Sequence, residues 1–207
     1  QREVNIATIE DPVEFDIEGV NQSQVDSAAK LTFAKGLRSV VRQDPDIIMV
    51  GEIRDEETAK IAVNAALTGH KLLSTLHTNN AASTMPRLID MEVEPFLVSS
   101  TLLIAIAQRL VRRVCEKCSG KKMVTRAEME VSFKKDILEL LFEGGDGVEV
   151  PEAKGCAACG NTGYKGRVGI YEILENSPSI QEMISRSADA ATIQDESARE
   201  GMTTIVQ

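Results

Sequence analysis

Three short apolar segments, each followed at once by charged or polar residues, constrain the fold of this chain more than any other feature. They cover residues 4–9, 47–50 and 72–76. The polar residues that follow them are Glu10-Asp11, Gly51-Glu52 and His77-Thr78. Apolar residues at helical spacing separate the segments, and strands that alternate with helices are typical of a parallel sheet. Because parallel strands end at the same edge of a sheet, we expect the polar residues to form one site there.

The same apolar spacing predicts where the helices lie. We expect one amphipathic helix from Ser27 to Arg42 and another from Glu56 to Leu67, with Gly69 as its C-terminal cap. Residues 14–24 are predicted to form a loop or an edge hairpin, and residues 143–147 a glycine-rich turn. The other predicted helices are Thr84–Met91, Pro95–Arg112, Arg126–Phe142 and, with a break at Ser187, Ser179–Gln207.

The composition indicates a soluble globular protein. Of the 207 residues, 43% are hydrophobic and 27% are charged, which is ordinary for a packed domain. The net charge of −9 argues against a surface devoted to nucleic acid, since phosphate contacts supply most of that affinity. The most apolar stretch, Phe96–Ala107, is too short to span a bilayer, so we expect a buried helix there. No targeting segment opens the chain, so a cytoplasmic protein is expected. A chain that begins inside a strand without Met is also expected to be a piece of a longer protein.

The segment from Asp46 to Asp55 suits nucleotide hydrolysis. A buried strand that ends in Gly51 and Glu52 delivers a carboxylate to the edge where a γ-phosphate and Mg²⁺ bind in α/β enzymes. Hydrolysis needs one carboxylate to orient water and another to organise the water shell of the metal, and Glu10 and Glu14 are candidates for the partner. A hydrophobic strand that ends in Glu is common, however, and taken alone it favours a structural role. No G-x-x-x-x-G-K-[ST] phosphate-binding loop occurs in these residues.

Both histidines of the chain follow the second predicted helix. His77 stands between Thr75 and Thr78 at the end of a predicted strand, where it could hydrogen-bond a γ-phosphate or transmit its presence to a neighbour. We favour this functional interpretation of His77 over a packing role. His70 follows a helix end, where the helix dipole favours histidine, so a purely structural role is nearly as well supported there.

All four cysteines form two C-x-x-C pairs, Cys115/Cys118 and Cys156/Cys159. This spacing predicts a tetrahedral zinc site with four thiolate ligands. Because four protein ligands leave no open position, the ion is predicted to stabilise the fold and not to catalyse. A cytosolic setting disfavours disulfides, the main competing interpretation, and the two symmetric pairs disfavour a redox dithiol.

A group of basic residues surrounds the first cysteine pair. A zinc ribbon with a basic flank could bind nucleic acid, but the net charge favours a solvated face or a contact with an acidic surface of a neighbouring subunit. The group consists of Arg109, Arg112, Arg113, Lys117, Lys121, Lys122 and Arg126.

Taken together, these segments resemble the type II/type IV secretion ATPase superfamily. Residues Thr8–Glu14 are similar to its Asp box, Arg42–Asp55 to its Walker B segment and Thr68–Asn79 to its His box, in the family's order. Ala107–Leu110 also matches. The four cysteines and Gly166–Glu172 resemble the type II secretion and type IV pilus assembly motors in particular, because the pilus retraction motors lack the zinc-binding region. The similarity runs from Thr8 to about Met202.

The resemblance implies an α/β fold with three parts. These are a partial RecA-like P-loop NTPase core with following helices over residues 1–112, a tetracysteine zinc-binding region over 113–172 and a C-terminal helical region over 173–207.

The resemblance also implies roles for individual residues. Glu10 would polarise the attacking water, Glu52 would act through Mg²⁺ and water, and His77 would sense or contact the γ-phosphate. Arg38 and Arg42 match arginines that the family keeps near this site, within one subunit or across a subunit boundary. Other contacts to ATP or Mg²⁺ are expected at Asp11, Glu14, Asp46, Gly51, Arg54, Thr75 and Thr78.

Members of this family form hexameric rings that hydrolyse ATP and move an inner-membrane platform protein, so that pilin subunits are lifted from the membrane. The resemblance therefore implies a cytoplasmic protein, peripheral to the inner membrane. Without the phosphate loop, the fragment alone is expected to bind ATP weakly and to be inactive. Two other functions stay open: a zinc-ribbon DNA-uptake, translocase or nucleic-acid-binding module, and a non-enzymatic zinc scaffold that docks subunits.

Overall fold

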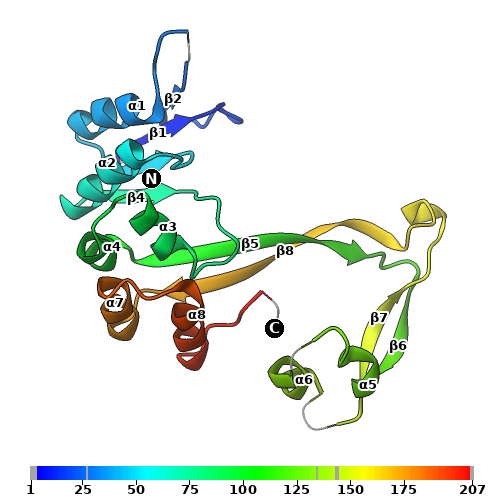
Figure 1. The fold of residues 1–207 in the computed structure, drawn as a ribbon. Helices are drawn as coiled ribbons and strands as arrows, with labels where there is room; N and C mark the ends of the chain where they lie inside the picture. Colours follow the sequence, from blue (N-terminus) through cyan, green and yellow to red (C-terminus); the bar gives the residue numbers. More distant parts are fainter. Residues whose placement is uncertain (1–3, 27, 134, 143–144, 206–207) are drawn as a thin grey trace. The chain divides into compact units, whose positions relative to one another are not determined.

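The fold is taken from a computed structural model, which describes residues 4–26, 28–133, 135–142 and 145–205. The chain divides into two compact units (Figure 1). The first consists of Gln1–Ala105 and Leu174–Gly201, and the second of Ile106–Ile173 and Met202–Gln207. The long strands β5 (Ile104–Val114) and β8 (Tyr164–Glu175) pair with each other, and each contains one of these boundaries.

A four-stranded parallel sheet organises the first unit, in the order β2-β1-β3-β4. Its strands are β1 (Ile6–Glu10), β2 (Asn21–Gln24), β3 (Ile47–Val50) and β4 (Lys71–Ser74). The predicted parallel sheet is thus confirmed, although the third predicted strand begins and ends earlier than expected. The segment predicted as a loop or an edge hairpin is a loop over residues 14–20 and a parallel edge strand over Asn21–Gln24, so the loop is confirmed in part and the hairpin is wrong. Polar β2 suits the edge because only one neighbour hydrogen-bonds to it.

Helices α1 (Phe33–Val40) and α2 (Glu56–Leu67) pack against each other and against the sheet (Figure 1). The predicted helix from Ser27 is therefore too long. Leu31 pairs with Asp26 in an isolated antiparallel bridge, and the Thr32 side chain accepts from the Lys35 N–H as N-cap, so the helix begins at Phe33. The 3₁₀ turn η1 (Val41–Gln43) follows before the chain enters β3. Gly69, with a positive φ of 101°, ends the α2 segment as predicted.

The predicted helix over Pro95–Arg112 is wrong beyond its first two turns. Helices α3 (Thr84–Asp90) and α4 (Pro95–Thr101) form, but the chain is a strand from Ile104 onward. The side-chain amide of Asn176 donates to the Ser99 and Leu102 carbonyl oxygens at 2.8 and 2.7 Å, so it satisfies the open end of α4. The backbone N–H of Asn176 then bonds the Leu103 carbonyl oxygen at 3.0 Å, and β5 begins at the next residue.

Two C-terminal helices complete the first unit. These are α7 (Pro178–Ser185) and α8 (Ala190–Arg199), and the predicted break between them is confirmed at Ser187, whose φ is 55°. Helix α7 packs on α4, where the Ser99 hydroxyl donates to the Gln181 carbonyl oxygen at 3.0 Å. The side chain of Gln194 on α8 accepts from the Asn80 amide at 2.7 Å. Segments about 100 residues apart in sequence thus pack together in the first unit.

The second unit contains an antiparallel pair of strands, β6 (Ser119–Thr125) and β7 (Gly147–Ala153). Between them lie helices α5 (Arg126–Met129) and α6 (Lys135–Phe142), so the single helix predicted over Arg126–Phe142 is wrong. A capping box begins α5, and the N–H groups of Ser132 and Phe133 both bond the Met129 carbonyl oxygen, which ends it in a turn. The 3₁₀ turn η2 (Ala157–Cys159) precedes β8. Residues 143–144 of the predicted glycine turn lie outside the described residues.

No helix in the described part of the chain combines the length and apolar character that crossing a membrane requires.

Candidate functional site

Hydrogen bonds beyond the ends of β1, β3 and β4 hold the residues that follow these strands together. The Gly51 N–H donates to the Ile9 carbonyl oxygen at 2.7 Å, which ties β3 to β1. The Ile53 N–H donates to the Thr75 carbonyl oxygen at 3.0 Å, and the Thr75 hydroxyl donates to the Gly51 carbonyl oxygen at 2.6 Å. The sheet order thus carries the predicted polar residues to one edge, as the sequence pattern indicated.

Glu52 lies at the centre of this edge. Its Oε2 is 3.0 Å from the Nε2 of His77, and its Oε1 accepts a hydrogen bond from the Arg54 guanidinium. The Glu52 side chain is 13% exposed, whereas the His77 side chain is 85% exposed. The hydrogen bond from Arg54 is the main cause that lowers the pKa of Glu52 below its ordinary value; partial burial opposes this, and His77 adds to it. The carboxylate is therefore ionised at neutral pH, beside a histidine that solvent or a ligand can reach.

Glu10 ends β1 next to this group. A Cβ placed on Gly51 would lie 3.4 Å from the Glu10 Cα, so the backbones approach closely at this point. Glu10 Oε1 accepts from the Thr8 hydroxyl at 2.5 Å and from the Gln22 amide at 2.9 Å. Glu10 and Glu52 therefore follow neighbouring strands at the same sheet edge, each with its own set of hydrogen-bond donors.

Some predicted nucleotide contacts lie near this edge as well. The carboxylates of Glu52 and, more weakly, Asp11 raise the pKa of Arg54, so Asp11 is close enough to act on that guanidinium. The Thr78 hydroxyl donates to the Asn80 carbonyl oxygen at 3.2 Å, within the loop that follows β4. Glu14 is exposed in the loop between β1 and β2.

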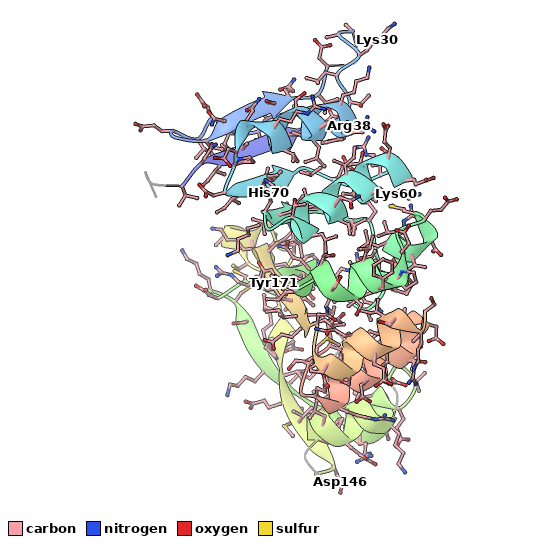
Figure 2. The ribbon with its side chains drawn as sticks, turned by 90° about the vertical axis from the view of Figure 1, so that its left-hand side faces the viewer. Lys30, Arg38, Lys60, His70, Asp146 and Tyr171 are labelled. Carbon is pink, nitrogen blue, oxygen red and sulfur yellow. The ribbon has the colours of Figure 1, made fainter. Side chains whose placement is uncertain are left out.

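The structure does not bring Arg38, Arg42 or Asp46 to Glu52. Arg38 projects from α1 (Figure 2) and pairs with Glu57 of α2 at 2.7 Å. Asp46 precedes β3 and accepts from the Asn5 N–H at 2.7 Å, which places it at the amino edge of the sheet. Arg42 lies next to Gln43, whose carbonyl oxygen accepts from the Asn5 side chain at the same edge. Within the described residues, these three side chains thus lie apart from the Glu52–His77 pair.

His70 lies where a purely structural role would place it, at the end of α2. Its Nδ1 lies 3.0 Å from the Ala65 carbonyl oxygen and 3.2 Å from the Thr68 hydroxyl, at the C-terminal end of α2 (Figure 2). A ring nitrogen that satisfies an open helix carbonyl explains a histidine here without a ligand.

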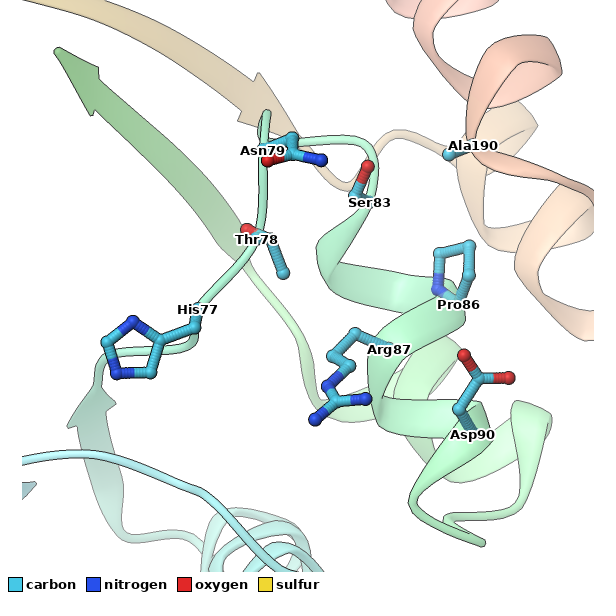
Figure 3. Close-up of a pocket in the computed structure, with 8 residues that line it drawn as sticks. All are labelled: His77, Thr78, Asn79, Ser83, Pro86, Arg87, Asp90 and Ala190. Carbon is cyan, nitrogen blue, oxygen red and sulfur yellow. The ribbon is translucent and has the colours of Figure 1, made fainter.

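Sequence reasoning missed an open hollow of about 500 Å³ that continues from His77 along α3. Figure 3 shows Arg87 of α3 and Ser83, the residue before α3, on its wall, and among the described residues the Arg87 guanidinium has no ion-pair partner. A cation on a short apolar helix directly after the histidine segment was the available signal. The full lining is His77, Thr78, Asn79, Ser83, Pro86, Arg87, Asp90 and Ala190.

The four cysteines converge in the second unit, with all four sulfur atoms within 4.8 Å of one another. A Zn–S bond of about 2.3 Å implies sulfur–sulfur distances of about 3.8 Å in a tetrahedron. The Cys156–Cys159 and Cys118–Cys159 sulfur distances are 3.8 and 3.9 Å, and none of the four is in a disulfide. The donor set and spacing thus fit a closed tetrahedral metal site.

Hydrogen bonds already favour a thiolate in this cluster. Burial of Cys159 opposes its charge, but backbone N–H groups of Cys156 and Gly163 donate to its sulfur and lower its pKa to about 6. Burial raises the pKa of Cys118 to about 12, because fewer such donors reach it.

The fold is a parallel α/β sheet with charged and polar residues at its carboxyl edge, and solved structures of secretion and pilus motors resemble it. Among solved structures, the chain resembles the pilus retraction motor PilT with bound ADP, at 27% identity and a TM-score of 0.60, over 98% of this chain and 50% of that chain. It also resembles the ATPase DotB of Legionella pneumophila, at 25% identity and a TM-score of 0.56, over 96% of this chain and 46% of that chain.

The chain belongs to the family described as "Type II/IV secretion system protein", whose model matches residues 1–207. The type IV pilus assembly ATPase PilB of Thermus thermophilus is 49% identical over 97% of this chain and 22% of its own length. The type II secretion system protein E of Klebsiella pneumoniae is 47% identical over 93% of this chain and 37% of its own length. The chain thus spans well under half of these two relatives.

Proposed function

We propose that this chain is the C-terminal catalytic part of an ATPase that powers type II secretion or type IV pilus assembly. The observation that carries the proposal is the hydrogen bond between Glu52 and His77, formed across β3 and β4 at the edge where Glu10 also lies. A catalytic pair must stay open to its substrate, and the His77 side chain of this pair is 85% exposed. The identity to secretion and pilus ATPases supports the same function.

In this proposal each edge residue has a chemical role. Glu10, with one carboxylate oxygen already held by donors, orients the attacking water through the other oxygen. Glu52, kept ionised by Arg54, holds the water shell of Mg²⁺, and the ion when bound supplies neutralising charge to the phosphate oxygens. His77 donates to the γ-phosphate from its exposed ring. Asp11, Gly51, Thr75 and Thr78 complete the edge, and Arg38 and Arg42 act across a subunit boundary.

The remaining parts of the proposal concern assembly. The subunits form a hexameric ring at the cytoplasmic face of the inner membrane and act on a platform protein there. The four cysteines bind one Zn²⁺. The ion is structural, because four protein ligands leave no open coordination position for a substrate. The phosphate-binding loop comes from another part of the full-length protein, so these residues alone do not turn over ATP.

Replacement of Glu52 by Gln in the full-length protein tests the proposal. We expect steady-state ATP hydrolysis to fall by roughly 100-fold or more, because the neutral amide cannot order the metal's water shell, while nucleotide binding is retained. Glu56→Gln is the matched control, since Glu56 pairs with Lys60 on the surface of α2. A non-enzymatic scaffold would show no turnover that depends on Glu52. Undiminished hydrolysis in the Glu52→Gln protein would contradict the assignment of the site.

A further inference from the structure

The carboxylate of Glu10 is held from one side only. The Thr8 hydroxyl and the Gln22 amide both donate to Oε1, at 2.5 and 2.9 Å. Within the described part of the chain, Oε2 accepts no hydrogen bond from protein. A glutamate side chain has three rotatable bonds, and two donors on one oxygen remove most of that freedom while the other oxygen stays available.

The sheet register brings these two donors to the carboxylate. Thr8 and Glu10 are two residues apart on β1, so their side chains point to the same face. In the parallel pairing of β1 and β2, Gln22 is the partner of Thr8, which places its side chain beside both. Ile9 faces the other way, with its side chain against Gly36 of α1. The donor pair therefore exists only in this register.

The amide orientation of Gln22 is determined by its surroundings. Its Nε2 donates to Glu10 Oε1 and to the Phe15 carbonyl oxygen at 3.0 Å, and its Oε1 accepts from the Ile17 N–H at 2.7 Å. A flipped amide would set its oxygen against a carboxylate and a carbonyl, and its NH₂ against an N–H donor. These hydrogen bonds therefore favour one orientation of the Gln22 amide. Through that amide, Glu10 is connected to the loop over residues 11–20.

We propose that Thr8 and Gln22 are positioning residues, which hold the Glu10 carboxylate so that its free oxygen is aimed at the attacking water. Gln22 also makes this aim depend on the conformation of the 11–20 loop. The inference rests on the proposed role of Glu10 as the water-orienting group. A displacement of about 1 Å at a reacting group lowers rates by roughly 100-fold, so the loss of either donor is felt in turnover.

Kinetics of the full-length protein test the proposal. Thr8→Val removes the hydroxyl with little change in shape, and Gln22→Met removes the amide from a chain of similar length. We expect kcat to fall by roughly 10-fold to 100-fold in each, with KM for ATP nearly unchanged, because substrate binding does not use these donors. Gln24→Met is the matched control: Gln24 is the register partner of Glu10 on the same strand, and its side chain accepts from the Val13 N–H of the same loop but donates no hydrogen bond to the Glu10 carboxylate. Equal losses in the Gln24 and Gln22 variants would overturn the inference.

Two further comparisons separate positioning from simple structural support. Thr8→Ser keeps the hydroxyl and should restore most of the kcat lost in Thr8→Val. In a Glu10→Gln background, Gln22→Met should cause no further loss, because the carboxylate that it positions is gone. A full additional loss in that background would mean that Gln22 acts elsewhere, and would reject the inference.

The same variants separate this inference from the proposed function. If Glu10→Gln abolishes turnover while Thr8→Val and Gln22→Met turn over normally, only the positioning role is wrong. If Glu10→Gln retains turnover, the proposed role of Glu10 is wrong and the positioning role falls with it.

Discussion

At the scale of single residues, the edge of the sheet depends on how one carboxylate is kept charged. Glu52 is largely covered, and burial alone would favour its neutral form. The Arg54 hydrogen bond outweighs that cost, and the exposed His77 adds a second donor. Glu52 is therefore ionised before any metal or nucleotide arrives, which is the state that binding to a hydrated cation requires.

Removing Arg54 should shift the titration of Glu52. The folded pKa lies below the unfolded value of about 4.3, so ionised Glu52 stabilises the fold above that pH, and the contribution is lost as pH falls through the folded pKa. In Arg54→Met we expect the Glu52 pKa to rise, measured by ¹³C NMR of its carboxyl carbon, and the loss of stability on acidification to begin at higher pH. Lys60→Met, which touches Glu56 and Glu92 instead, should leave that titration in place. An unchanged Glu52 titration in Arg54→Met would show that the ion pair does not form in solution.

Of the side-chain contacts at this edge, some could be predicted from the sequence and others could not. Glu52 and His77 could be predicted as neighbours, because each follows an apolar strand and parallel strands end together. Gln22 could not, because its contact with Glu10 depends on which residue of β2 pairs with Thr8. Gln22 and Gln24 stand at alternate positions and share one face, but β2 is polar at all four positions and shows no apolar alternation that would predict a strand.

At the scale of elements, local chemistry decides where each helix begins. Asp55 directly follows the segment that carries Glu52, and it caps α2. Its Oδ1 accepts from the Thr58 N–H at 2.8 Å and from the Thr58 hydroxyl at 2.9 Å. The cap also holds the end of the Gly51–Asp55 segment, which carries Glu52. A helix that begins elsewhere would change the path of that segment.

Asp55→Ala should lower the free energy of unfolding by about 1 kcal/mol, because the first turn of α2 loses its side-chain acceptor. Urea denaturation followed by circular dichroism measures this change. Asp195→Ala, an exposed position within α8, is the matched control and should change stability by less than about 0.5 kcal/mol. Equal effects of the two substitutions would show that the cap does not stabilise α2.

The transition from α4 to β5 could not be predicted from apolar spacing. Residues Ile104–Ala107 fit a helix extended from α4 as well as they fit a strand, because a short apolar run carries no distinguishing period. The deciding group is Asn176, which bonds the α4 carbonyl groups from more than 70 residues away. Local preference was overridden by a tertiary contact.

At the scale of the whole molecule, the two units depend on different sources of stability. The first buries a continuous set of apolar side chains, which includes Ile9, Leu37, Ile48 and Ile193. The second has fewer fully buried apolar residues among those described: Leu138 and Phe142, and the cysteines Cys115 and Cys159. A small unit with a limited core commonly relies on a metal.

Metal removal should therefore act on one unit only. Protein purified without chelator is expected to contain one Zn²⁺ per chain, measured by atomic emission. Chelation should raise hydrogen exchange over residues 115–163, because the bound metal supplies part of the folding free energy there, while β1 and β3 stay protected. Cys118→Ser should reproduce this pattern without chelator. Protein with no stoichiometric zinc would refute the assignment of the metal.

By itself, the sequence determined the parallel α/β core, the polar residues at the ends of its strands and the four-cysteine cluster. Each depends on a short-range pattern: the apolar period, the residues that follow a strand, and the C-x-x-C spacing. Only the tertiary structure decided that α7 packs on α4 and α8 on α7, that Asn176 ends α4, and that Thr8 and Gln22 hold Glu10. Those outcomes depend on register and on contacts between distant segments. Such contacts form when the chain closes on itself, and no local pattern encodes them.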